Sequence, residues 1–122
     1  MVGFRELDDA VPFARQLDGE HGRIVFMNVF RVAPTDEDAF MEASTADGEF
    51  MKKQPGFICT QLHRGVAGSH TFVNVAEWES TATFRAAAGS PEFQTSLSRY
   101  PDSAVASPHI FAKVAVPGIC GD

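Results

Sequence analysis

The chain has 122 residues, 44% of them hydrophobic, and carries a formal net charge of −6. This length and hydrophobic content fit one domain with its own core. Its ten basic residues are scattered, which argues against a nucleic acid or an anionic membrane as partner, because either would require clustered Lys and Arg.

Targeting signals and cysteine motifs give the next limits. No apolar run approaches the length needed to cross a bilayer, and the first six residues lack the charged-then-apolar order of a secretory signal. Cys59 and Cys120 belong to no C-x-x-C pattern, so neither a redox motif nor a zinc site is indicated. We therefore expect a cytoplasmic protein without a metal centre.

The chain divides into an N-terminal extension, residues 1–22, and a domain, residues 23–122. A short amphipathic piece around residues 11–17 is the only element that the extension suggests. Residues 23–32 (RIVFMNVFRV) are rich in β-branched and aromatic side chains and place apolar groups on both faces, which predicts a strand covered on both sides.

A helix is predicted next. Thr35, followed three residues later by Asp38, resembles a capping box, and the acidic run at residues 36–38 suits a helix N-terminus. The helix ends near residues 52–54, and Gly48 weakens it by roughly 1 kcal/mol relative to Ala. Its apolar stripe consists of Phe40, Ala43, Ala46, Phe50 and Met51.

The second half of the chain predicts a hairpin, two helices and a last strand. Strands at residues 57–64 and 70–79 flank a glycine-containing turn. Ser80 can cap a helix that runs to about Ala88, and Ser90 followed by Pro91 opens another short one. After a segment with several Pro and Ser residues, residues 109–116 predict the last strand.

The order β-α-β-β-α-β predicts an α+β, ferredoxin-like split β-α-β fold: a four-stranded antiparallel sheet with helices on one face. The other face would expose an apolar patch that is large for a monomer. We therefore expect a homodimer that closes sheet against sheet, a dimeric α+β barrel. The residues of this patch are Val25, Met27, Val29, Val73 and Val75.

Two asparagines and the single tryptophan are the candidate site residues. Alternation along a strand puts Asn74 and Trp78 on one face. Asn28 lies among apolar positions of the first strand, where an unpaired amide would cost roughly 1–3 kcal/mol. If the three converge beneath the helices, they line an apolar pocket with a few oriented donors, which suits a flat, partly polar small molecule. A core aromatic beside a satisfied amide is the alternative.

Other side chains are less specific. Phe40, Phe50, Phe72 and Phe84 could wall a substrate pocket or pack the core. We expect His63 and His70 on the surface or in an interface, and His109 either against a partner subunit or at the pocket mouth. No histidine pair has ligand spacing, and no nucleophile elbow or glycine-rich phosphate loop occurs, which disfavours a metal site, a triad hydrolase and a nucleotide enzyme.

Three segments in order resemble the antibiotic biosynthesis monooxygenase (ABM) domain: FMNVF at 26–30, QPGF at 54–57 and FVNVAEWES at 72–80. The resemblance covers about residues 23–95 and is greatest to the anthrone oxygenases of aromatic polyketide pathways. It implies a dimeric ferredoxin-like enzyme that oxidises an anthrone-like polycyclic substrate to a quinone, with O2 as co-substrate and no cofactor. It also implies that Asn28, Asn74 and Trp78 are catalytic.

Two departures from the family bear on the mechanism. Leu62 and Phe84 stand where some cofactor-independent relatives carry tyrosines, so tyrosine-based proton transfer is not expected. Leu97 stands where the haem-degrading branch has its iron-ligating histidine, although His109 could substitute. A haem-binding or haem-degrading monooxygenase therefore stays an alternative, and so does a non-catalytic dimeric ligand-binding or cyclase-like accessory protein.

Overall fold

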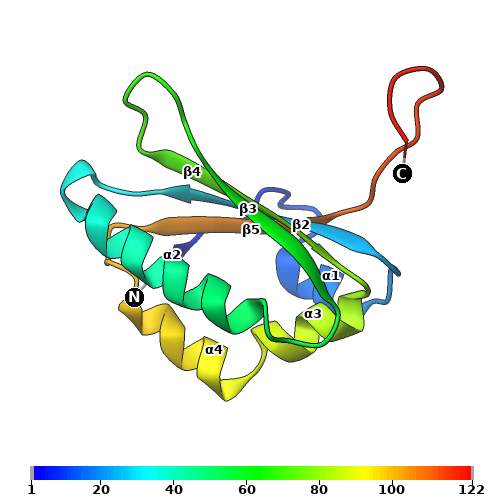
Figure 1. The fold of residues 1–122 in the computed structure, drawn as a ribbon, viewed down its shortest axis with the longest axis horizontal. Coiled ribbons are helices and arrows are strands. Elements are labelled where there is room, and N and C mark those ends of the chain that lie inside the picture. The colour runs from blue at the N-terminus through cyan, green and yellow to red at the C-terminus, as the bar shows by residue number, and fades with distance from the viewer. Residues whose placement is uncertain (1, 122) are drawn as a thin grey trace.

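In the computed structural model, which describes residues 2–121, five strands form one sheet in the order β1-β5-β2-β4-β3 (Figure 1). β2 pairs antiparallel with β4 and β5, β3 pairs antiparallel with β4, and β1 runs parallel to β5. The predicted α+β ferredoxin-like fold is confirmed, with a fifth strand that the extension contributes. The strands are β1 (Gly3–Phe4), β2 (Ile24–Arg31), β3 (Phe57–Arg64), β4 (Thr71–Trp78) and β5 (Val105–Phe111).

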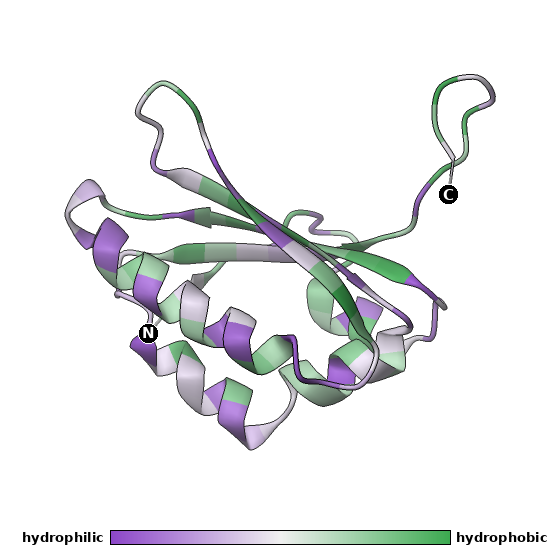
Figure 2. Ribbon diagram, viewed as in Figure 1, coloured by the Kyte–Doolittle hydropathy of each residue, from purple (hydrophilic) through white to green (hydrophobic). Residues whose placement is uncertain are grey.

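The helices cover one face of this sheet. α2, α3 and α4 lie below it in Figure 1, and the upper face is open. Hydrophilic and hydrophobic residues alternate along α2 (Figure 2), as an amphipathic helix on a sheet requires. The helices are α1 (Phe13–Asp18), α2 (Glu37–Met51), α3 (Thr81–Ala88) and α4 (Pro91–Ser96), with 3₁₀ turns at Pro34–Asp36 and Leu97–Arg99.

Two of the three predicted helix caps are confirmed. The Ser80 hydroxyl accepts from the backbone N–H of Thr83 at 3.1 Å, and the Ser90 hydroxyl accepts from that of Phe93 at 3.3 Å. The capping box at Thr35 is wrong, because Pro34–Asp36 forms a 3₁₀ turn and α2 starts without a side-chain cap. α2 also continues unbroken through Gly48.

The predicted last strand was placed too late in the chain. β5 starts at Val105 and contains Pro108, which lies outside the predicted strand at residues 109–116. The backbone groups of Ala106 and Ile110 bond outward, away from β2, and Pro108 has the same parity. β1 has ended by this point, so the missing N–H of Pro108 leaves no ladder bond unmade, as for proline on an edge strand.

The N-terminal extension forms hydrogen bonds along the outer edge of β5. β1 pairs with the start of β5, where Gly3 N–H donates to Ala104 O at 2.7 Å. Farther along, the Gln16 side chain bonds both the N–H and the C=O of Ile110, each at 2.9 Å. A side chain therefore replaces a strand at the second half of this edge.

The same extension is fastened to α3. The Glu20 carboxylate accepts from the backbone N–H groups of Thr81 and Ala82 at 3.2 and 3.0 Å, at the helix N-terminus, where negative charge is favoured. From the same helix, the Arg85 guanidinium donates to the backbone oxygens of Leu17 and Gly19. Residues 2–22 are thus an integral part of the fold.

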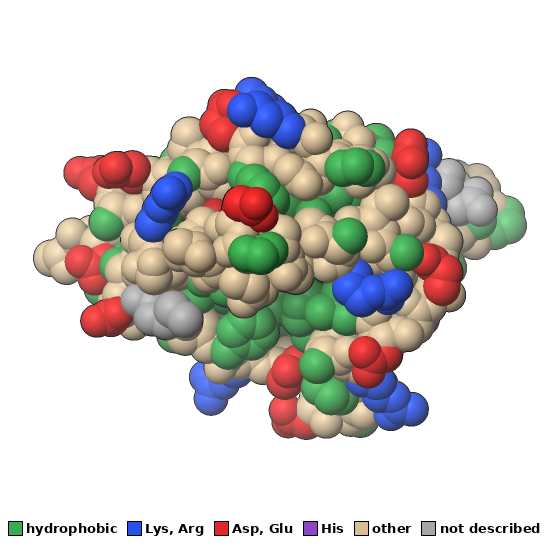
Figure 3. All heavy atoms as spheres, turned by 90° about the horizontal axis from the view of Figure 1, so that it is seen from below, with side chains coloured by type: hydrophobic (Ala, Val, Ile, Leu, Met, Phe, Trp, Pro, Cys, Tyr) green, Lys and Arg blue, Asp and Glu red, His purple; other side chains and the backbone are tan. Residues whose placement is uncertain are grey.

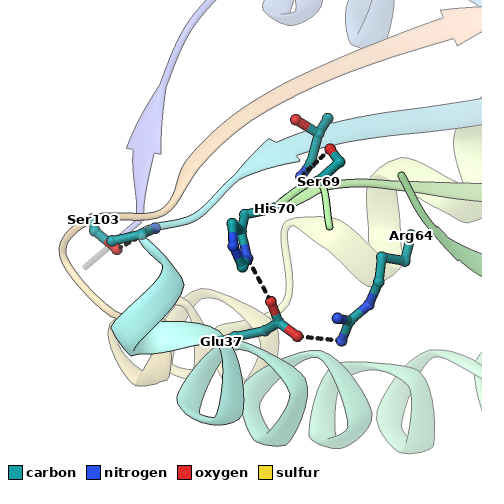
Figure 4. A network of polar contacts seen from close by, with 7 residues as sticks. Glu37, Arg64, Ser69, His70 and Ser103 are labelled. Atoms are coloured by element: carbon teal, nitrogen blue, oxygen red, sulfur yellow. Dashed lines mark hydrogen bonds and ion pairs between the residues drawn. The ribbon is translucent and has the colours of Figure 1, made fainter. Parts of the chain in front are cut away.

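The β3–β4 hairpin is fastened to α2 by a charged cluster (Figure 4). Glu37 at the start of α2 accepts from His70 at 2.7 Å and pairs with Arg64. These contacts, chiefly that of His70, hold the pKa of the Glu37 carboxyl below its usual range. His70, expected to be an ordinary surface or interface histidine, therefore has a definite structural partner.

Two groups of buried side chains form the core. One contains Phe30, Phe40, Phe72 and Tyr100, and the other contains Ile24, Trp78, Phe84 and Ile110. Members of both groups border a cavity between the sheet and the helices. Among residues 2–121, no helix has the length and apolar character that a membrane span needs.

Candidate functional site

A cavity of about 560 Å³ lies between the helix layer and the sheet. Small-molecule sites typically have volumes of about 300–1,000 Å³. Seen from the helix side, hydrophobic side chains gather in a hollow between the helices (Figure 3). Most residues that line it are apolar, with a few polar groups among them, which is the composition of a site for a hydrophobic ligand that must be oriented.

The two asparagines meet on the floor of this cavity. Asn28 in β2 and Asn74 in β4 are direct cross-strand partners, and both line the cavity. Residues opposite each other on paired strands have Cβ atoms about 4.5–5.5 Å apart. The Thr60 hydroxyl of β3 donates to Asn74 Oδ1 at 2.7 Å, which leaves the two amide N–H groups of Asn74 as donors.

Asn28 carries an unmet hydrogen-bonding group. Its Oδ1 atom is buried without a partner, and its side chain makes no hydrogen bond within residues 2–121. A buried polar atom left in this state costs about 1–3 kcal/mol. A ligand that donates a hydrogen bond to Asn28 would remove this cost, so the amide is a candidate binding group.

Trp78 lies four residues after Asn74 on the same face of β4 and also lines the cavity. Its ring is 1% exposed and contacts Phe57 edge-on, with ring centroids 5.4 Å apart. The ring centroid of Phe84 in α3 lies 5.5 Å from that of Trp78. Three side chains from two strands, Asn28, Asn74 and Trp78, therefore share one sheltered cavity.

Only one of the four phenylalanines considered as cavity walls lines the cavity. Phe84 lines the cavity, whereas Phe40, Phe50 and Phe72 are absent from its described lining. Phe40 and Phe72 are fully buried against each other, with ring centroids 4.7 Å apart, because they close one end of the core beneath α2. Phe50 turns toward Phe93 of α4, with centroids 6.5 Å apart. Of the two possibilities that the sequence left open, these three side chains pack against other rings and do not border the cavity.

Several residues that line the cavity were not predicted as site residues. The extension contributes four apolar side chains, and no sequence motif in that segment predicted that they would line a cavity. Asp47 has a usable signal, since it follows Phe40 and Ala43 at helical spacing on an otherwise apolar stripe. The missed residues of the extension are Val2, Phe4, Phe13 and Leu17.

Asp47 is buried on the helix side of the cavity. Its Oδ1 lies 2.7 Å from the Ser96 hydroxyl, and its Oδ2 accepts from the Tyr100 hydroxyl at 2.6 Å. Burial raises the pKa of Asp47 above its usual range, although both hydroxyls and the charge of Arg99 act to lower it. Burial, reinforced by the neighbouring carboxyl, raises the pKa of Tyr100 as well.

His109 does not reach the cavity. Ala106 and Pro108 of β5 line it, so alternation puts His109 on the opposite face of the sheet. There it is buried, and its Nε2 lies 3.2 Å from the Gln16 amide nitrogen. Leu97 borders the cavity instead. Within residues 2–121, no three His, Cys, Asp or Glu side chains cluster as metal ligands.

Comparisons with known proteins agree with this architecture. The antibiotic biosynthesis monooxygenase family model matches residues 23–98. SnoaB, a cofactor-independent oxygenase from Streptomyces nogalater, is similar over 80% of this chain and 99% of its own, with a TM-score of 0.72 and 22% identity. A protein of Shewanella loihica PV-4 described as a candidate monooxygenase is similar over 78% of this chain and 97% of its own, with a TM-score of 0.66 and 27% identity. No curated protein matches the chain.

Proposed function

Because the chain belongs to the antibiotic biosynthesis monooxygenase family, we propose that this monooxygenase converts an anthrone-like, electron-rich polycyclic aromatic to a quinone with O2 and without a metal or flavin. One observation carries the proposal: Asn28 and Asn74 face each other in register on the floor of an apolar cavity that Trp78 also lines. The description of SnoaB as a cofactor-independent oxygenase supports it.

The chemistry needs little from the protein if the substrate itself is the reductant. An anthrone that loses a proton becomes a delocalised enolate, which can pass an electron to O2 and recombine with it as a peroxide. Loss of water from that peroxide leaves the quinone. The protein must favour the anion, hold it still and keep water away, and donors aimed at a developing oxyanion in a dry site supply roughly 10²–10³ in rate each.

The hydrogen bonds already present support a different role for each amide. Thr60 occupies the oxygen of Asn74, so in this proposal the N–H groups of Asn74 donate to the enolate oxygen. Asn28 has a free buried oxygen, which would accept from a ring hydroxyl of the substrate. The pair therefore suits a substrate that presents a hydroxyl next to a carbonyl. Trp78 packs against the rings and offers one N–H donor.

Oxygen uptake with a model anthrone, in chelator-treated buffer without flavin or nicotinamide, tests this function. We expect one quinone per O2 consumed, with the rate falling at least about 100-fold in Asn74→Ala and clearly in Trp78→Phe. Circular dichroism and unfolding curves serve as the folding control. Folded variants that oxidise anthrone as fast as the parent would refute the assigned roles.

We also propose that the protein works as a homodimer through the open face of the sheet. Val25, Met27 and Val29 on β2, with Val73 and Val75 on β4, form a half-exposed apolar surface there. Exposed apolar patches of this kind mark interaction surfaces. Sedimentation analysis should show a dimer for the parent and a monomer for Val75→Glu. A parent that stays monomeric would contradict the pairing.

A further inference from the structure

We propose that Asp47 exchanges protons with the substrate: its carboxylate takes two protons in turn from the reacting CH2 carbon, returning the first to the peroxide and the second to the departing hydroxide. This inference rests on the proposed function, and it concerns a residue outside the amide pair and the indole. It also supplies the base that the two amides cannot be, since a neutral amide is not an effective proton acceptor.

The position of Asp47 suits this role. It lines the cavity from α2 while the amide pair lines it from the sheet, so a ligand between the two layers lies between them. Arg85 is the other charged residue among the described lining residues. Arg85 is exposed, bonds backbone oxygens of the extension and cannot accept a proton.

The hydrogen count around Ser96 limits how far its hydroxyl can stabilise the Asp47 carboxylate. The Ser96 hydroxyl lies 2.7 Å from Asp47 Oδ1 and 2.6 Å from the backbone oxygen of Phe93. One hydroxyl hydrogen cannot serve two acceptors fully. A protonated Asp47 resolves the conflict, because the acid donates to Ser96 and Ser96 donates to Phe93. This arrangement of hydrogen bonds therefore favours protonation of Asp47.

Opposing influences act on the pKa of Asp47. Arg99 follows α4, and its charge favours the carboxylate, as does the Tyr100 hydroxyl. Arg85 also lines the cavity. Burial acts the other way and is the largest influence on the pKa of Asp47, which is raised. A base is most effective when its pKa approaches the working pH, and this shift is in that direction.

One carboxyl group can carry out every proton transfer in the reaction. Asp47 takes a proton from the reacting CH2 carbon, and the electron pair stays on the substrate as the enolate. The enolate gives electrons to O2, forming a carbon–oxygen bond, and Asp47 protonates the resulting peroxide. Asp47 then takes the second hydrogen of that carbon as a proton, the C–H pair forms C=O, the O–O bond breaks, and the proton passes to the departing hydroxide. The sum is CH2 plus O2 giving C=O plus H2O.

Asp47→Asn tests this role, with Asp38→Asn as matched control on an exposed turn of the same helix. General acid–base catalysis contributes roughly 10²–10⁴-fold, so we expect anthrone oxidation to fall at least about 100-fold in the first variant and less than about twofold in the second. Tyr100→Phe removes a donor to the carboxylate and should move the rising limb of the pH–rate profile to higher pH without lowering its plateau.

A second readout does not depend on turnover. The infrared band of protonated Asp47 is identified as the carboxyl band that is lost in Asp47→Asn and kept in Asp38→Asn. This band should change in frequency or intensity when 1-hydroxyanthraquinone is added, a ligand that cannot be oxidised in the same way. If the parent oxidises anthrone and Asp47→Asn matches it at every pH, the role of Asp47 is overturned and the proposed function stands. If the parent neither oxidises anthrone nor binds the quinone, the proposed function fails. A band indifferent to bound quinone also overturns the role of Asp47.

Discussion

Replacing Asn28 by Leu should separate binding from stability. Leu has nearly the same shape as Asn and removes a buried oxygen that has no hydrogen-bond partner. The unpaired oxygen costs about 1–3 kcal/mol, so the free energy of unfolding should rise by up to that amount. Activity should change in the opposite direction, because the substrate hydroxyl loses its acceptor. A loss of about 1–3 kcal/mol of binding to the substrate and transition state lowers kcat/KM for anthrone oxidation roughly 5- to 150-fold.

Asn74→Leu is the matched variant. Asn74 has a partner in Thr60, so its loss should lower the free energy of unfolding by about 0.5–1.5 kcal/mol, the net contribution of one hydrogen bond. Urea unfolding followed by far-UV circular dichroism measures both changes, and oxygen uptake measures both activities. If Asn28→Leu is the less stable of the two variants, the Asn28 amide has a structural partner and the reasoning is refuted.

Three further predictions concern the extension, α2 and Asp47. Gln16→Ala should lower the free energy of unfolding by about 1–3 kcal/mol, since it leaves the buried N–H of Ile110 unpaired; an unchanged urea midpoint would contradict this. Gly48→Ala should raise it by up to about 1 kcal/mol, because an added Cβ meets open space, and a loss would show hidden crowding. Asp47→Asn should be more stable than the parent near pH 7. Because the pKa of Asp47 is raised in the folded state, the parent loses stability as the pH rises from the ordinary aspartate pKa near 3.9 through the folded-state pKa. The difference in the free energy of unfolding should therefore vanish in acid. A difference that grows on acidification would reverse the assigned direction.

Local chemistry made most of the domain predictable. The serines before α3 and α4 cap those helices as expected, because a cap depends on neighbours three residues away. The alternation of side chains along β4 predicts that Asn74 and Trp78 share one face, whichever strands pair with β4. The cross-strand pairing of Asn28 with Asn74 was implied by the fold rather than by either segment alone.

The parts that failed depend on contacts distant in sequence. Pro108 is acceptable within β5 only because β1 ends before reaching it, which no local pattern reveals. Residues 1–22 have weak periodicity, yet they supply four cavity side chains, since the rest of the fold offers them an edge and a helix end. Phe40 and Phe84 are chemically alike, and only the position of α2 and α3 over the sheet decides which one borders the cavity.

A crystal structure of the protein with bound 1-hydroxyanthraquinone tests the central claim most directly. The account predicts that the rings lie in the cavity beside Trp78, with one ligand oxygen within hydrogen-bonding distance of Asn28 Oδ1 and another within reach of the Asn74 amide nitrogen. A ligand bound elsewhere, with this cavity left unoccupied, would contradict it.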